Sequence, residues 1–288
     1  MHGLVVLDKP AGMTSHDVVA RCRRVFGQRR VGHAGTLDPD ATGVLLVGLG
    51  QCTRLLRFLT EQPKTYRGEV VLGVETTTLD GAGEVVAQHE MQGVDLSGVE
   101  AAAVRFVGPI EQVPPMVSAV RVGGRRLHEL AREGREVARP ARRVVVHSLQ
   151  VTPTSDPGVF GLDVACSAGT YVRTLAADLG RALGGGAHLR RLRRLAIGPF
   201  SVDTACRLED LDPSAVLPPA AAVGHLQRVV AGPQLLPRIA HGSVLDEPWP
   251  GPGPWAVVDD PGALVAVYEL RSGGGGQKPS VVLTSSLP

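Results

Sequence analysis

Short apolar runs of β-strand length recur along this 288-residue chain, and they constrain the fold more than any other feature. The clearest are Gly3–Leu7, Val44–Leu49, Val144–Val151 and Phe160–Cys166. In Thr65–Gly73 apolar and polar residues alternate, which is typical of a half-buried strand. A β-sheet is therefore expected as the main scaffold.

Segments with helical spacing lie between these runs. Thr14-Ser15 offers capping oxygens to a helix whose apolar residues recur up to Val25. Leu96–Val107, Arg126–Arg132 and Tyr171–Leu183 are further helical segments. The order does not alternate strictly between strand and helix, so the pattern indicates an α+β protein.

Two turn regions interrupt the elements. Gly32–Gly43 is polar and rich in glycine and is predicted to be a loop. Thr76–Gly83 predicts a hairpin turn around Asp80-Gly81, followed by a strand at Glu84–Gln88.

The composition changes after Leu211, where prolines flank alanine-rich sequence. Trp255–Val258 and Leu264–Leu270 are the clearest strands beyond this point. We expect two domains, residues 1–222 and a small β-rich domain of residues 223–288.

Charge and cysteine usage limit the class of protein. The net charge of +2 divides into +6 for residues 1–200 and −4 for residues 201–288, which is compatible with a polyanionic partner. The four cysteines form no C-x-x-C pair, so neither a zinc site nor a disulfide framework is indicated. No apolar stretch reaches the roughly 18 residues of a membrane span, and the N-terminus does not read as a secretion signal. A cytoplasmic protein without a metal is expected.

The segment Gly32–Gly43, G-H-A-G-T-L-D-P-D-A-T-G, is the best candidate for chemistry. Its glycines allow sharp turns and the close approach of a ligand to the backbone. Pro39 biases Asp38 toward an extended backbone, so the loop presents a carboxylate between two structured elements. An isolated Asp-Pro is more often an ordinary turn.

This segment resembles the signature of the TruB family of pseudouridine synthases over all of its length. Four more segments resemble family motifs in the same order, so that the resemblance spans roughly residues 3–210. They are Asp8–Ser15, Lys64–Asp80, Gln112–Ala119 and Cys166–Arg173.

The resemblance implies a mixed, largely antiparallel sheet of the pseudouridine synthase type with flanking helices. It implies an isomerase that flips uridine 55 out of the T-loop of tRNA and converts it to pseudouridine. No cofactor, no metal and no obligatory protein partner are implied. The absence of long basic extensions favours a solitary bacterial enzyme, expected to be a monomer.

The resemblance assigns catalysis to Asp38, Tyr66 and Arg173. Asp38 acts at the ribose as nucleophile or base, and the family places Arg173 beside it. A guanidinium there would hold the pKa of the carboxyl down. Tyr66 stacks on the base and lies near its C5 atom. Outside a motif, a lone Arg would be interpreted as a solvated helix residue and a lone Tyr as a half-buried strand residue. The motifs around Arg173 and Tyr66 favour a functional role for both.

Substrate-binding positions follow from the same motifs. His33 resembles the histidine that takes the stacking space of the extruded nucleotide, and Leu192 matches a position that packs on the flipped base, with a core leucine as an alternative. The complete set is His33, Gly35, Thr36, Leu37, Tyr171 and Leu192.

Arginine-rich sequence indicates RNA contacts. The family uses residues of about 114–143 as a loop that clamps the T-stem and loop, but Arg121 and His128 depart from its usual Lys and Tyr. The cluster Arg190–Arg194 is either a second basic surface or a solvated face. The C-terminal segment is similar to a PUA-type RNA-binding module, with a structural cap as the alternative. A tRNA-folding chaperone and a guide-RNA-dependent relative are the competing functions.

Overall fold

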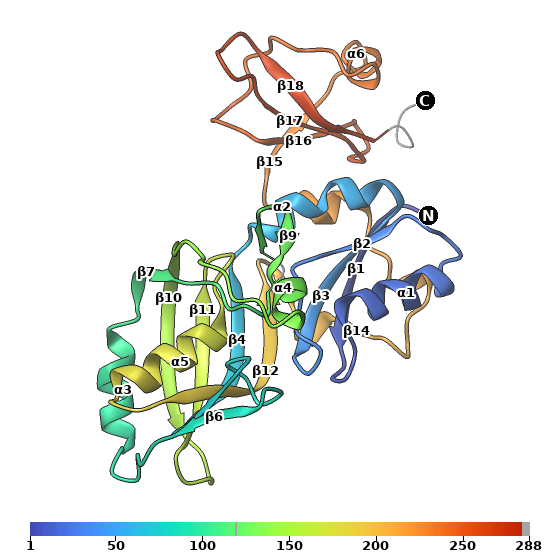
Figure 1. Cartoon of the computed structure of the whole chain (residues 1–288). Coiled ribbons are helices and arrows are strands. Elements are labelled where there is room, and N and C mark those ends of the chain that lie inside the picture. Colours follow the sequence, from blue (N-terminus) through green and yellow to red (C-terminus); the bar gives the residue numbers. More distant parts are fainter. Residues whose placement is uncertain (119, 284–288) are drawn as a thin grey trace.

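The computed structural model describes residues 1–118 and 120–283. Ala119, the last residue of one motif, and residues 284–288 of the expected C-terminal domain lie outside the described residues. The chain forms a large part built on a ten-stranded sheet and a small part built on a four-stranded sheet (Figure 1).

The large sheet has the order β14-β1-β3-β12-β4-β11-β10-β7, with β2 paired to β3 and β13 paired to β12. The pairs β1–β14 and β3–β12 are parallel, and the five other neighbouring pairs along this order are antiparallel. The prediction of a mixed, largely antiparallel sheet is thus confirmed. Its strands are β1 (Gly3–Lys9), β2 (Val31–Ala34), β3 (Thr42–Leu49), β4 (Lys64–Leu72), β7 (Gly108–Gln112), β10 (Arg142–Pro153), β11 (Val159–Cys166), β12 (Ala187–Ile197), β13 (Phe200–Ser201) and β14 (Cys206–Arg207).

Four helices flank this sheet: α1 (Ser15–Val25), α2 (Leu56–Thr60), α3 (Leu96–Val104) and α5 (Val172–Ala182). Helix α1 begins at a capping box in which Thr14 and Asp17 bond each other's backbone amides, and it packs on β1 and β3 through its apolar face. Helices α3 and α5 pack on β4, β10 and β11. Short 3₁₀ helices η1 (Gly50–Arg54), η2 (Val202–Thr204), η3 (Pro213–Ala215) and η4 (Pro219–Val223) complete the connections.

Two of the regions that differ from the sequence prediction lie close to the loop Gly32–Gly43 or at the centre of the sheet. Val31–Ala34 is strand β2 rather than loop, because its backbone pairs with Leu46–Leu49 of β3. Strand β12 was assigned no element, yet it lies between β3 and β4 at the centre of the sheet. The leucines of β12 are three residues apart, so the sequence does not show the two-residue alternation of a strand. The strand tolerates this spacing because its register with β4 shifts at two places.

Two small hairpins lie beside the sheet. The predicted turn at Thr76–Gly83 joins β5 (Val74–Thr76) to β6 (Val85–Gln88). Within residues 114–143, β8 (Arg121–Val122) pairs with β9 (Arg125–Arg126), and α4 (Leu127–Arg132) follows. In Figure 1, α4 projects in front of the central strands.

The small part contains β15 (Gln227–Val230), α6 (Leu236–Ala240), β16 (Trp255–Val258), β17 (Leu264–Leu270) and β18 (Gln277–Val282). Apolar residues of its sheet, including Val258 and Val267, share one core with Phe58 and Leu59 of α2. Arg57 on α2 also pairs with Glu269 on β17. The small sheet is therefore packed directly onto the large part.

Candidate active site

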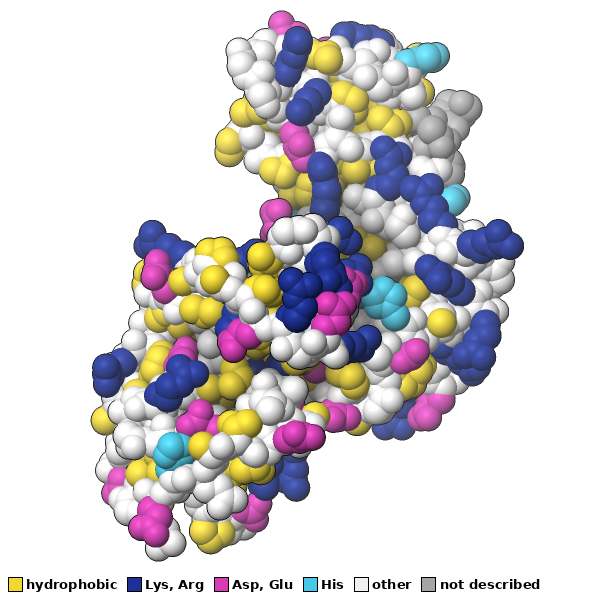
Figure 2. All heavy atoms as spheres, in the orientation of Figure 1, with side chains coloured by type: hydrophobic (Ala, Val, Ile, Leu, Met, Phe, Trp, Pro, Cys, Tyr) yellow, Lys and Arg dark blue, Asp and Glu magenta, His cyan; other side chains and the backbone are white. Residues whose placement is uncertain are grey.

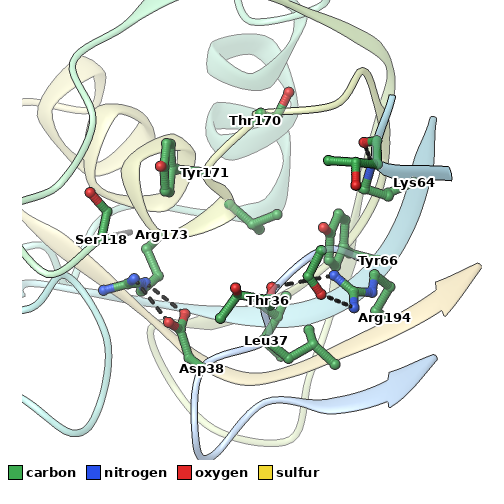
Figure 3. A pocket seen from close by; sticks show the side chains of 15 residues that line it. Thr36, Leu37, Asp38, Lys64, Tyr66, Ser118, Thr170, Tyr171, Arg173 and Arg194 are labelled. Atoms are coloured by element: carbon green, nitrogen blue, oxygen red, sulfur yellow. Dashed lines mark hydrogen bonds and ion pairs between the residues drawn. The ribbon is translucent and has the colours of Figure 1, made fainter. Parts of the chain in front are cut away.

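A pocket of about 280 Å³ opens near the centre of the large sheet. The loop before β3, the strands β4 and β12 and the start of α5 contribute its walls (Figure 3). Eight of the nine residues predicted from the motifs line it: Gly35, Thr36, Leu37, Asp38, Tyr66, Tyr171, Arg173 and Leu192.

Asp38 and Arg173 form a two-pronged ion pair at one side of the pocket. Nε of Arg173 lies 3.0 Å from Oδ2 of Asp38, and its Nη2 donates to Oδ1 at 3.1 Å. The Arg173 side chain is 6% exposed and that of Asp38 is 38% exposed. The guanidinium of Arg173 is thus buried, and its two parallel N–H donors hold the carboxylate of Asp38 at the pocket surface.

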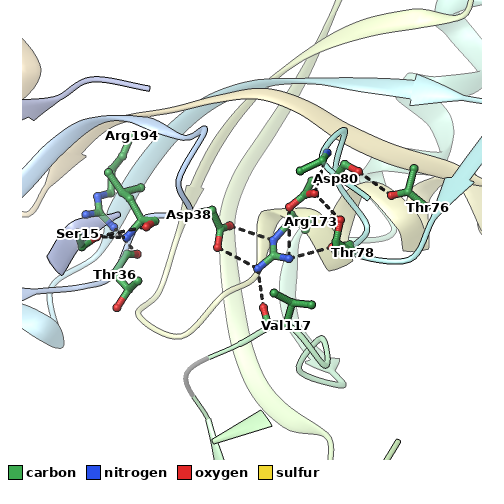
Figure 4. A network of polar contacts seen from close by, with 11 residues as sticks. Ser15, Thr36, Asp38, Thr76, Thr78, Asp80, Val117, Arg173 and Arg194 are labelled. Atoms are coloured by element: carbon green, nitrogen blue, oxygen red, sulfur yellow. Dashed lines mark hydrogen bonds and ion pairs between the residues drawn. The ribbon is translucent and has the colours of Figure 1, made fainter. Parts of the chain in front are cut away.

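Three further groups fix the Arg173 guanidinium (Figure 4). It donates to the carbonyl oxygens of Thr78 and Val117, each at 2.9 Å. Its Nη1 also lies 3.4 Å from Oδ2 of Asp80, whose other carboxylate oxygen accepts from the Thr78 hydroxyl. The β5–β6 turn and the segment of residues 114–143 therefore both help to orient the ion pair.

The pKa of Asp38 is raised above its ordinary value, because burial of the carboxyl outweighs the attraction of Arg173. The neighbouring charge of Asp80 raises it further. The expected contact with Arg173 is present, but the expected net lowering of the pKa is wrong. Arg173 opposes the effect of burial without overcoming it.

The loop that carries Asp38 is fixed by residues of the N-terminal motif. The Ser15 hydroxyl bonds both to the amide of Leu37, at 2.9 Å, and to its carbonyl oxygen. Lys9 is fully buried and its Nζ donates to the carbonyl oxygens of Met13 and Pro39 at 2.6 and 2.8 Å. Burial lowers the pKa of Lys9 to about 8. These bonds join two motifs that are far apart in the sequence.

Tyr66 forms part of the pocket wall on β4 and is 7% exposed. Burial raises the pKa of its hydroxyl, while the charge of Arg194 acts in the opposite direction. Tyr171 precedes α5, and its amide donates to Oε1 of Gln112 at 2.9 Å. Leu192 lies on β12 in the same pocket.

His33 is the one predicted site residue that does not line this pocket. Its ring meets the ring of His16 edge to face, with centroids 5.3 Å apart. Burial and the nearby His16 lower the pKa of His33 to about 4, so the ring is neutral at pH 7. The side chain is fixed on β2, beside the loop that carries Asp38.

The motif reasoning missed two cations that line the pocket, Lys64 and Arg194, which are 7% and 1% exposed. Arg194 was grouped with its basic neighbours on β12, but the group does not act as one surface. Arg190 pairs with Glu69, and Arg193 pairs with Asp8. Gly43 allows the backbone of β12 to approach, since a Cβ there would lie 2.1 Å from the Arg194 carbonyl oxygen.

Within residues 1–118 and 120–283, no three His, Cys, Asp or Glu side chains are placed to hold a metal ion. In the same residues, no helix is long and apolar enough to cross a membrane.

Comparison with known proteins decides the family. Residues 23–172 match the TruB family pseudouridylate synthase N-terminal domain, and residues 173–231 match the tRNA pseudouridylate synthase B C-terminal domain. The chain belongs to the TruB family. The protein named tRNA pseudouridine synthase B of Symbiobacterium thermophilum is 51% identical over 83% of this chain and 82% of its own length. The protein of that name from Thermobifida fusca is 44% identical over 99% of both chains.

The solved structure of a Cbf5-Nop10-Gar1 complex has a similar fold. It aligns with a TM-score of 0.75 and 26% identity over 99% of this chain and 87% of the other. The TruB motifs identified in the sequence contribute Asp38, Tyr66 and Arg173 to one pocket. Membership of the family supports an isomerase that converts uridine to pseudouridine.

Proposed function

We propose that this TruB-family protein isomerises uridine 55 in the T-loop of tRNA, with Asp38, Tyr66 and Arg173 as its catalytic residues. The observation that carries the proposal is the Asp38–Arg173 fork at the mouth of a pocket that also contains an aromatic ring. The relatives described above bear the name tRNA pseudouridine synthase B, which supports tRNA as the substrate.

The reaction defines what the pocket must do. The bond between N1 of uracil and C1′ of ribose breaks, and both electrons leave with the base. The base turns, and C5 forms the new bond to C1′; a proton leaves C5 and N1 gains one. No electrons are exchanged with a cofactor. An ionised carboxylate is needed next to C1′ or C2′, and Asp38 is the carboxylate that lines the pocket.

Access to the pocket requires that the uridine leave its stack, which costs a few kcal/mol. Stacking on Tyr66 and packing against Leu192 offset part of this cost. We assign Gly35, Thr36, Leu37 and Tyr171 to the binding of the nucleotide. We assign His33, outside the pocket, to the space that the nucleotide leaves.

RNA binding is assigned to the segment of residues 114–143 and, as a PUA-like domain, to residues 223–288, with residues 1–222 as the catalytic domain. Basic side chains gather over the region of β9 and α4 and along the junction of the two parts (Figure 2). The carbonyl oxygen of Val117 accepts a bond from Arg173, so a shift of this segment on RNA binding would reach the catalytic ion pair. Phosphate contacts there would make binding sensitive to salt.

We propose that the protein acts alone, as a monomer, on free tRNA. The aligned Cbf5 structure was solved with two partner proteins, but the relatives with 41–51% identity carry the tRNA enzyme's name. A requirement for added proteins or a guide RNA would contradict this part of the proposal.

The test is tritium release from unmodified tRNA labelled at uridine C5, with the purified protein and no added metal. Release of one tritium per tRNA is expected, and none from tRNA in which uridine 55 is replaced by cytidine. Full release from the replaced tRNA would overturn the assigned position. No release by folded protein that binds tRNA would overturn catalysis and leave a folding chaperone.

A further inference from the structure

Lys64 is a buried cation whose bonds involve no acidic side chain. Its Nζ donates to the carbonyl oxygens of Thr60 and Gln62 at 2.7 and 2.6 Å. Both acceptors lie at the end of α2 or just after it, and the lysine is the first residue of β4. Two of its three protons are used in this way, and the side chain lines the pocket.

Arg194 is bonded in the same manner. Its Nε donates to the Val44 carbonyl oxygen at 2.7 Å and its Nη2 to the Gly35 carbonyl oxygen at 2.9 Å. A longer contact of 3.4 Å joins Nη1 to the carbonyl oxygen of Thr36. A side-chain hydrogen bond also joins Arg194 to the Tyr66 hydroxyl. The guanidinium is thus held by uncharged groups, chiefly backbone carbonyl oxygens, and it too lines the pocket.

Among the described residues, neither Lys64 nor Arg194 has an ion pair with a carboxylate. On the same strand as Arg194, Arg190 pairs with two carboxylates and Arg193 with one. Burial of a charge without a counter-ion is costly, so two such charges in one pocket require a reason. A ligand that carries negative charge would supply it.

The two cations lie close together, away from the catalytic ion pair. A Cβ atom on Gly35 would be 3.5 Å from Nη1 of Arg194 and 3.8 Å from Cε of Lys64. Figure 3 shows both side chains around Tyr66, on the far side of the pocket from Asp38 and Arg173. The pocket is therefore polarised, with its carboxylate at one side and its uncompensated positive charge at the other.

We infer that Lys64 and Arg194 are catalytic residues that stabilise the negative charge of uracil after its bond to ribose breaks. The inference rests on the proposed function. Both electrons of the N1–C1′ bond pass to the base, whose charge spreads over N1, O2 and O4. The charge is lost again when C5 bonds to C1′, so the stabilisation acts on the intermediate and on the transition states beside it, as selective catalysis requires.

The protonation state of Lys64 supports this role near neutral pH. Burial lowers its pKa to about 8, so the ammonium is present below that pH and is lost above it. The groups that face it are Arg194, which lowers the pKa, and Cys166, which raises it. The pKa of Cys166 is about 11 and that of Tyr66 is raised, so both titrate at higher pH.

The first test is Lys64→Met, which keeps most of the side-chain length and removes the charge. With enzyme in excess over tRNA, the single-turnover rate should fall about 100-fold or more, the usual loss for one group that stabilises an anion in a dry site. Binding of tRNA should stay within about threefold. The matched control is Arg105→Gln, which removes one exposed positive charge after α3 and should leave the rate unchanged.

The second test separates anion stabilisation from a structural role by changing the leaving group. Fluorine at C5 stabilises the uracil anion, so 5-fluorouridine at the target needs less help from Lys64. Chromatography of nuclease digests measures the rate at which the original glycosidic bond breaks. With 5-fluorouridine, the factor by which Lys64→Met lowers this rate should be at least tenfold smaller than with uridine. An equal defect for both bases, or a wild-type rate in the variant, would overturn the inference.

If Lys64→Met does not fold, Lys64→Arg still decides, because an arginine keeps its charge well above pH 8. With uridine as the target, the fall of kcat/KM above about pH 8 should be smaller in this variant than in the wild type, and an equal fall would overturn the inference. Failure of the proposed function looks different, because the wild type itself would then leave uridine unchanged at every pH.

Discussion

The two sides of the pocket hold buried cations in opposite ways. At one side Arg173 contacts two carboxylates, those of Asp38 and Asp80. At the other side Lys64 and Arg194 are bonded to backbone carbonyl oxygens. The same charge therefore has two uses. In this pocket Arg173, which carboxylates neutralise, orients a reactive group, whereas the charges of Lys64 and Arg194, which no carboxylate pairs with among the described residues, are left to act on a ligand.

Among changes to the cations, the largest effect should come from removal of Arg173, the neutralised one. Arg173→Met leaves the half-buried carboxylates of Asp38 and Asp80 without their shared counter-charge, so the pKa of Asp38 should rise further and its orientation should be lost. We expect the single-turnover rate at pH 7 to fall about 1000-fold. The control Arg67→Met removes an arginine from an exposed pair with Asp163 and should change the rate little. A rate within tenfold of wild type for Arg173→Met would remove the distinction between the two sides.

The sequence predicted the carboxylate side better than the cationic side. Asp38, Tyr66 and Arg173 stand in long motifs, and the motifs meet in space because Ser15 and Lys9 bond to the loop that carries Asp38. The motifs themselves are local patterns that can be recognised in a linear chain, although the contacts between them are not local.

Arg194 could not be found in that way. It stands among three other arginines, and its burial depends on Gly43 and on the carbonyl oxygens of a distant loop. The strand that carries it was missed because its leucines, three residues apart, do not show a strand period. The net pKa of Asp38 was misjudged for a similar reason, since burial is a property of the whole fold.

The second effect concerns the glycine between the two cations. Gly35 has φ +77°, which strains any residue with a Cβ, and the added atom would touch both Arg194 and Lys64. We expect Gly35→Ala to lower stability by about 1 kcal/mol and the rate about tenfold. Gly158→Ala has the same kind of strain, with φ +70° and no neighbour within 4 Å, and should lose stability without loss of rate. Both variants are assayed at a temperature where both are folded. Equal rates for Gly35→Ala and Gly158→Ala would contradict the account.

A smaller effect should appear in the pH profile. The charge of Asp80 raises the pKa of Asp38, so Asp80→Asn should lower that pKa. Activity requires the ionised carboxylate and is gained as the pH rises through this pKa. The acid limb of kcat/KM should therefore move to lower pH in the variant, even if its maximum is reduced. A limb that stays in place or moves upward would show that Asp80 does not act on Asp38 electrostatically.

The smallest effect should lie at the junction of the two sheets. Arg57 and Glu269 are 52% and 34% exposed, and such pairs contribute about 0–1 kcal/mol. Glu269→Gln should leave the rate unchanged and shift the thermal midpoint by a few degrees at most, because the apolar core around Phe58 remains. A large loss of activity in this variant would make the junction part of the catalytic machinery.

The most direct test of the central claim compares wild type with Asp38→Asn in tritium release from C5-labelled tRNA at equal occupancy. The substitution keeps the shape of the side chain and removes its charge. The account predicts complete loss of release, with tRNA affinity within about tenfold and an unchanged fold by circular dichroism, because phosphate contacts supply most of the affinity. Tritium release at a wild-type rate by Asp38→Asn would contradict it.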